Sequence, residues 1–164
     1  MSRTSKTAKE IQGDFLNWVK SAPIITDQNT RRALPYTLPF VLGAGGMADC
    51  VSGGVYRQGL RPRDSRLEDI TVGFVAGVPD QIQTGTIAIC IYVPDIDPYE
   101  NGVLVEDMQR TAQLELVAQD WYDSIHTLAI GQGYNLSLQD TITTVEDEPI
   151  QQHFVSVMLN YKYY

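Results

Sequence analysis

An alternating apolar run at residues 84–93, TGTIAICIYV, constrains the fold more than any other feature of the sequence. Successive side chains of a strand point to opposite faces, so every second residue shares a face. One face of this run carries branched apolar side chains, and the other carries small or aromatic ones. The pattern predicts a central strand that is covered on both faces. The branched residues are Ile87, Ile89, Ile91 and Val93, and the opposite ones are Ala88, Cys90 and Tyr92.

Three further segments extend this strand into a sheet. Residues 69–76 (DITVGFVA) alternate in the same way and are separated from 84–93 by a turn region, which predicts an antiparallel hairpin. Residues 136–145 and 153–163 predict two more strands, joined by the acidic turn EDEP. Pro94 has no N–H to donate, so we expect it to end the ladder of its strand.

Residues 103–129 carry apolar side chains at the spacing of an amphipathic helix. The stripe consists of Leu104, Met108, Thr111, Leu114, Ala118, Trp121, Ile125 and Leu128. Gly131 and Gly133 are expected to end this helix. Together with the strands it predicts an α+β fold, namely a mostly antiparallel sheet of at least four strands with the 103–129 helix packed on one face.

The N-terminal part of the chain has a different pattern. Residues 5–20 show helical spacing, and Ser5 or Thr4 is expected to cap the helix. Pro and Gly are frequent over residues 21–66, which predicts an extended arm or docking loop. We therefore expect an N-terminal helix and irregular arm over residues 1–53 and an α+β core over residues 54–164.

The net charge of −8 is distributed unevenly. Residues 1–66 hold ten basic and five acidic residues, a net of +5, whereas residues 67–164 hold two basic and fifteen acidic residues, a net of −13. Most of the chain would repel nucleic acid, so only the N-terminal segment could meet phosphates. The charges allow two interpretations: acids that keep the protein soluble, or a polar molecule that meets copies of itself or partners by opposite charge.

Cysteine usage and hydropathy indicate a protein made in a reducing cytosol. Cys50 and Cys90 lack CxxC spacing, and Cys90 lies in an apolar run where a buried, inert thiol is expected. No apolar run approaches the ~20 residues that span a bilayer, and no apolar h-region follows the first ten residues. We therefore expect neither a membrane span nor a secretory signal.

Few residues occur in patterns typical of catalysis. Residues 43–46 (GAGG) lack the Lys-Ser/Thr of a phosphate-binding loop and predict a turn. His126 and His153 stand outside any metal-ligand motif, so structural roles are expected for both. The segment PDIDPYENG places acids as a calcium loop does, but Tyr99 occupies a ligand position. A solvated loop with Asx turns is the favoured prediction, and a metal site between Asp95 and Asn101 is the alternative.

Residues 54–95 form the most specific pattern of the chain. It runs GVYRQGLRPRDSRLEDITVGFVAG and then QIQTGTIAICIYVPD, with an aromatic strand, a basic RPxxS turn, an acidic pair that opens a strand, and a long strand ending in VPD. This pattern resembles small tail-completion proteins of siphovirus-like phages and prophages, particularly those of gut Bacteroidales. The element order over residues 54–164 is similar to that of the tail-terminator family, whose members have a helix-flanked β-sheet and form a ring on the end of the tail tube.

The resemblance implies a structural virion protein, made in the cytoplasm of the bacterial host, and not an enzyme. It implies a homo-oligomeric ring that completes or caps the tail tube and joins it to the head–tail connector, without a cofactor or a membrane. The candidate interface residues are Arg57, Arg61, Arg63 and Arg66, for which local salt bridges are the alternative, and Leu38, Phe40, Val41 and Leu42 of the arm. Two other function classes stay open: a small metal- or ligand-binding protein, and a nucleic-acid-binding adaptor that uses the N-terminal basic residues.

Overall fold

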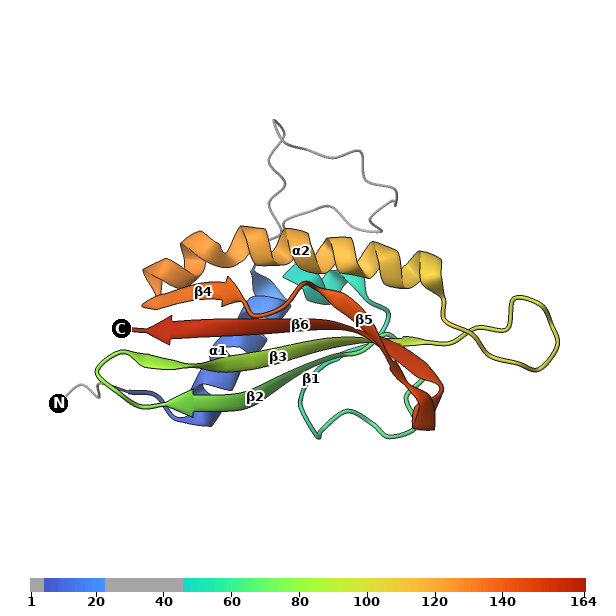
Figure 1. Ribbon diagram of the computed structural model, residues 1–164, viewed down its shortest axis with the longest axis horizontal. Coiled ribbons are helices and arrows are strands. Elements are labelled where there is room, and N and C mark those ends of the chain that lie inside the picture. The colour runs from blue at the N-terminus through green and yellow to red at the C-terminus, as the bar shows by residue number, and fades with distance from the viewer. Residues whose placement is uncertain (1–4, 23–45) are drawn as a thin grey trace, which may run out of the picture.

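The computed structural model of the chain describes residues 5–22 and 46–164, in which six strands form one sheet beside two α-helices (Figure 1). The elements are, in order, α1 (Ala8–Ser21), the 3-10 helix η1 (Gly46–Cys50), β1 (Val55–Arg57), β2 (Ile70–Val78), β3 (Gln83–Pro94), α2 (Met108–Gly131), β4 (Tyr134–Leu138), β5 (Thr143–Asp147), the 3-10 helix η2 (Glu148–Ile150) and β6 (Gln152–Tyr163). The predicted α+β fold is confirmed, including a long helix that packs on one face of a mostly antiparallel sheet.

The sheet is built around β3 and β6, which pair antiparallel over their full lengths. β2 forms the predicted antiparallel hairpin with β3, and β4 and β5 both pair with the other edge of β6. Within the described part of the chain, the pairing of β1 with β2 is the one parallel pairing. β3 is therefore a central strand, as its sequence predicts, and Pro94 is its last residue.

Residues 136–145 form parts of two short strands and not the single predicted strand. Leu138 of β4 pairs with Leu159, whereas Thr143 of β5 pairs with Ser156, so the chain between them is two residues longer than the facing part of β6. Ile142 lies in this longer stretch and is buried. Burial of its side chain offsets the ladder hydrogen bonds that the interruption loses.

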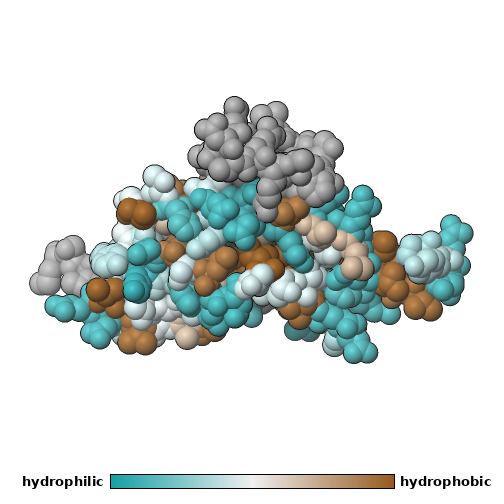
Figure 2. All heavy atoms as spheres, turned by 45° about the horizontal axis from the view of Figure 1, so that its top comes forward, coloured by the Kyte–Doolittle hydropathy of each residue, from teal (hydrophilic) through white to brown (hydrophobic). Residues whose placement is uncertain are grey.

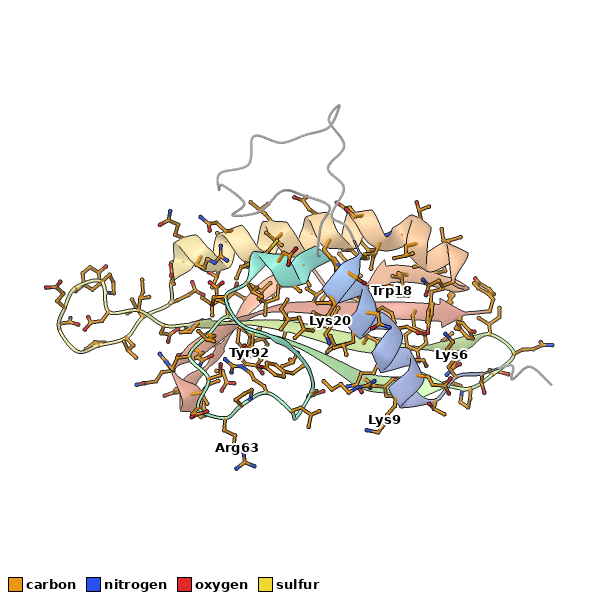
Figure 3. The ribbon with its side chains drawn as sticks, turned by 180° about the vertical axis from the view of Figure 1, so that it is seen from behind. Lys6, Lys9, Trp18, Lys20, Arg63 and Tyr92 are labelled. Carbon is orange, nitrogen blue, oxygen red and sulfur yellow. The ribbon has the colours of Figure 1, made fainter. Side chains whose placement is uncertain are left out.

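The hydrophobic core lies between one face of the sheet and the two helices (Figures 1 and 3). Ile87 and Ile89 of β3 and Phe15 of α1 are fully buried there. Trp121 of α2 is fully buried too, and its indole N–H donates to the carbonyl oxygen of Trp18 at 3.1 Å. α1 thus shares one core with the sheet, although the boundary expected at residue 53 places this helix outside the α+β core. The apolar side chains of α1 are buried because transfer of apolar surface from water into the protein interior is favourable.

The start of α1 is fixed by Thr7, where the sequence suggests Ser5 or Thr4. The Thr7 hydroxyl accepts from the backbone N–H of Glu10 at 3.3 Å, and the Glu10 carboxylate accepts from the backbone N–H of Thr7 at 3.3 Å. This reciprocal pair is a capping box, which satisfies two N–H groups that the first helical turn leaves without partners. The helix therefore begins at Ala8.

The long helix begins later than its apolar stripe predicts. The Asp107 carboxylate accepts from the backbone N–H of Arg110 at 3.2 Å and so caps α2. Met108 at the first position of the helix is 70% exposed, and Leu128 near its end is 39% exposed, so both ends of the predicted stripe lie outside the core. Among residues 5–22 and 46–164, no helix combines the length and apolar character needed to cross a membrane.

The opposite face of the sheet, which we call the open face, carries Thr84, Thr86, Ala88, Cys90 and Tyr92 of β3. The sequence predicts that β3 is covered on both sides, but all five of these residues are only half-buried. The connection between β1 and β2, residues 58–69, covers one end of this face and leaves the other end uncovered. Most of these side chains are small or polar, so their partial exposure to water costs little free energy, because they present little apolar surface.

Candidate interaction surfaces

The connection 58–69 is held on the open face by Arg61. Its guanidinium donates to the Asp69 carboxylate at 2.9 Å and to the Gln152 side-chain oxygen at 2.8 Å, and it stacks over the ring of Tyr92 at 4.1 Å. Asp69 is 1% exposed and also accepts from the backbone N–H of Gly54 at 2.9 Å. Arg61 is therefore a structural residue that ties the connection to β3 and β6 and braces its last residue, Asp69.

Two more of the predicted interface arginines bind within their own chain. Arg57 donates to the side-chain oxygen of Gln12 at 2.7 Å, and Arg66 donates to the carbonyl oxygen of Ile150 at 3.0 Å. Arg61 thus forms a local salt bridge of the kind named as the alternative, whereas Arg57 and Arg66 bind neutral oxygen atoms of the same chain. The exposed Arg63 makes no hydrogen bond or ion pair with residues 5–22 or 46–164, and its side chain points away from the body (Figure 3).

The apolar residues predicted as the contact surface of the arm lie outside the described residues. These are Leu38, Phe40, Val41 and Leu42. The described residues expose apolar side chains in the connection 58–69 and in the loop between β3 and α2, and also on the β2–β3 hairpin and at the ends of α2. In the connection, Leu60 is 67% exposed and Leu67 is 53% exposed.

A cleft of 360 Å³ lies between the connection and the open face. Its floor is made of small residues, Gly73 of β2 and Ala88 and Cys90 of β3, and Arg63 stands among its lining residues. We call it the connection cleft; its full lining is Gln58, Gly59, Arg61, Arg63, Thr71, Gly73, Ala88, Cys90 and Tyr92. The Gln58 side chain lies directly over Gly73, so the room for a larger side chain from another molecule lies over Ala88 and Cys90.

A second hollow, of 410 Å³, lies over the uncovered end of the open face. Strands β3, β4 and β6 supply its lining, which is Thr84, Gly85, Thr86, Asn135, Leu136, Ser137, Asn160, Tyr161 and Lys162. Six of its nine lining residues carry a side-chain hydroxyl or amide group, and Lys162 is its single charged residue. The lining can hydrogen-bond to polar groups, but it contains no acid–base pair.

Residues 95–107 form a narrow loop that projects from the end of the sheet (Figure 1), and we call it the finger. Ile96 and Val105 exchange two backbone hydrogen bonds of 2.8 Å at its base. At its tip the Asp97 carboxylate accepts from the backbone N–H groups of Asn101, at 3.1 Å, and Gly102, at 2.9 Å. Both oxygens of Asp97 are therefore used by the loop itself, and the predicted Asx turn is present at Asn101, whose side-chain oxygen accepts from the backbone N–H of Val103 at 3.0 Å.

The finger exposes a row of apolar side chains. Tyr99 is 75% exposed, Val103 is 59% exposed, and Ile96 and Val105 are exposed as well. Hydrophobic atoms are visible on this projecting end next to hydrophilic ones (Figure 2). No Lys or Arg occurs between residues 95 and 107, whereas the finger contains five acidic residues: Asp95, Asp97, Glu100, Glu106 and Asp107.

His153 joins the base of the finger to β6, a role that the sequence does not reveal. Its Nδ1 atom lies 2.7 Å from the Asp95 carboxylate, and its Nε2 atom lies 3.8 Å from the Glu106 carboxylate. His153 is 58 positions from Asp95 and 47 positions from Glu106 along the chain, so no spacing rule relates it to either acid. The cluster anchors the finger, and the structural role expected for His153 is the one that it has here.

Burial raises the pKa values of two cysteines and a tyrosine near the core. Burial raises the pKa of the Cys50 and Cys90 thiols to about 11, so both are neutral thiols at pH 7. The pKa of Tyr134 is raised by burial and by its hydrogen bond to Asp14, at 2.6 Å. These shifts stabilise uncharged side chains and do not activate a nucleophile.

Comparison with known proteins adds no assignment to these surfaces. No protein-family model matches the sequence, and no curated protein matches it. Within residues 5–22 and 46–164, no group of three or more His, Cys, Asp or Glu side chains is placed to hold a metal ion. The finger and the connection cleft are therefore the features on which a functional argument can be built.

Proposed function

We propose that this protein is a structural component of a phage tail, which assembles as a ring, completes or caps the tail tube and joins it to the head–tail connector. The single observation that carries the proposal is the finger, whose exposed apolar side chains project from the body beside a sheet with one open face. Exposed apolar groups of this kind mark sites of protein association. The resemblance of residues 54–95 to tail-completion proteins supports the same role.

A ring requires that each copy present two different surfaces to its two neighbours. The chain offers such a pair, because the finger is acidic and apolar, while the connection 58–69 has no net charge but exposes Arg63 and two leucines. Exposed charges are screened beyond about 8 Å at physiological salt, so they set register and association rate, and apolar contact supplies most of the attraction. Charge that guides association and apolar contact that supplies the attraction are suited to a component that is added once to the end of a tail tube.

The test is co-production with the major tail-tube protein encoded in the same genome. Tubes assembled with this chain should carry an extra ring of density at one end in electron micrographs, and tubes assembled without it should have bare ends. Tubes whose ends and lengths are unchanged by an excess of the purified chain would contradict the proposal.

A further inference from the structure

We propose that the finger of one copy docks into the connection cleft of a second copy, with Tyr99 in the cleft and Glu100 paired with Arg63. This inference rests on the proposed ring and names the contact that would build it. Within one chain the two surfaces do not meet, because no finger residue lines the cleft. The contact is therefore one between molecules.

Shape favours Tyr99 as the anchor. It is the most exposed large apolar residue among residues 5–22 and 46–164, at 75%, and it projects from the tip of the finger. The cleft has a volume of 360 Å³ and is floored by Ala88 and Cys90, while Gln58 covers Gly73. Tyrosine anchors that fill such hollows account for much of the binding free energy of protein interfaces. An arginine at the rim adds a cation–π contact with the ring.

Charge complementarity identifies the partner as a second copy. Glu100 follows Tyr99 directly, is exposed, and makes no hydrogen bond through its side chain or ion pair with a described residue. Arg63 is its counterpart at the cleft, being exposed and without an ion pair to a described residue. The other arginine of the cleft, Arg61, is already bound to Asp69. One unpaired acid on the finger thus matches one unpaired base on the cleft.

The apolar surroundings match as well. Val103 of the finger is exposed, as Tyr99 is, and Leu60 and Leu67 are exposed in the connection that bounds the cleft. The finger is also ordered before it binds, since Asp97 and the Ile96–Val105 pair hold its shape. A preorganised loop loses little conformational entropy on docking.

The test is sedimentation velocity over a concentration series of the full chain and its variants. Tyr99→Ser should weaken self-association at least about 30-fold, as loss of a central anchor does, and Arg63→Glu should weaken it as well. Tyr164→Ser, which removes another exposed tyrosine, and Lys9→Glu, which reverses another exposed cation, are the matched controls and should associate as the parent does. Glu100→Arg combined with Arg63→Glu should restore association.

Mixing two defective chains sharpens the test. Tyr99→Ser keeps an intact cleft and Arg63→Glu keeps an intact finger, so an equimolar mixture should form one-to-one pairs and nothing larger. If the parent associates, and Tyr99→Ser and Arg63→Glu both associate as tightly as the controls, the finger–cleft contact is overturned. The proposed ring would still stand. If those variants instead form rings that no longer hold tail tubes, the finger binds the tube protein and the contact between copies is again overturned. A parent that stays monomeric overturns both proposals.

Discussion

The two faces of the sheet are made by alternate residues of the same strands, yet only one face is completed within the chain. Ile87 and Ile89 are fully buried under the helices, whereas Thr86 and Ala88 on the open face are half-buried. The chain uses α1, η1 and α2 on the first face and a single connection on the second. We infer that the stability of the fold depends mainly on the face covered by the helices. Contacts made by the open face and the finger would leave the buried side chains of that core unchanged.

Removing α1 should have the largest effect, because it uncovers the helical face. The helix buries Ile11, Phe15, Trp18 and Val19; at about 1.5–3 kcal/mol each, their loss is comparable with the whole stability of a domain, about 5–15 kcal/mol. A chain of residues 23–164 should lose its near-ultraviolet circular dichroism and its cooperative unfolding. Cooperative thermal unfolding with a native spectrum would instead show that the sheet and α2 suffice. Asn17→Ala, at an exposed position of the same helix, should leave the full chain folded.

Truncation of a single tryptophan tests the same face from α2. Trp121→Ala should lower the free energy of unfolding by about 3–5 kcal/mol, since it leaves a cavity and removes the bond to Trp18. Met108→Ala, on the same helix but 70% exposed, should change it by less than about 0.5 kcal/mol. Urea unfolding of both variants measures the difference; equal effects would contradict the placement of α2.

Substitutions of two nearby arginines should differ in their effect on stability, because Arg61 is bound in the covered part of the open face and Arg63 is exposed at its rim. Arg61→Ala should destabilise the protein by about 3–5 kcal/mol, because it leaves the buried Asp69 carboxylate without its cation. Arg63→Ala should change the stability by less than about 0.5 kcal/mol. The melting temperatures of the two variants provide the test, and a stable Arg61→Ala variant would mean that the connection is held by other contacts.

Alkaline pH should weaken both faces by a smaller amount. The thiol pKa values of Cys50 and Cys90 rise from a usual 9.0 to about 11 in the folded protein, and the pKa of Tyr134 is raised as well. The folded state therefore holds protons that the unfolded chain releases, so stability is full below about pH 9 and falls as pH rises toward 11. Urea unfolding between pH 7 and pH 11 should show this decline, with a shallower slope for Cys90→Ala. A flat profile, or an equal slope in that variant, would rule out this cause.

Periodicity was sufficient to predict the sheet, the β2–β3 hairpin and the long helix. Each depends on a run of side chains that alternate or repeat within one segment, as in residues 84–93. Element ends were harder, because Thr7 and Asp107 act through single hydrogen bonds that compete with similar neighbours. The interruption before β5 depends on the burial of Ile142, which only the assembled core determines.

The candidate surfaces were predictable only in part. Asx turns in the finger follow from the local sequence, whereas the pairing of His153 with Asp95 joins segments 58 positions apart. The four arginines look alike in sequence, and only the fold shows that Arg61 faces Asp69 while Arg63 faces solvent. Of the exposed apolar residues on the finger, Ile96 and Tyr99 lie in the predicted loop, whereas Val103 and Val105 lie in the range predicted as helix, because Leu104 and Met108 continue the helical spacing.

Native mass spectrometry of the purified full chain tests the central claim most directly. If the open face and the finger serve to build a ring, the spectrum should contain one closed oligomer of fixed subunit number, in exchange with monomer as concentration falls. Raising salt should slow its formation without preventing it, because charge sets the rate and apolar contact supplies the attraction. A monomer at every concentration and every salt would contradict the account.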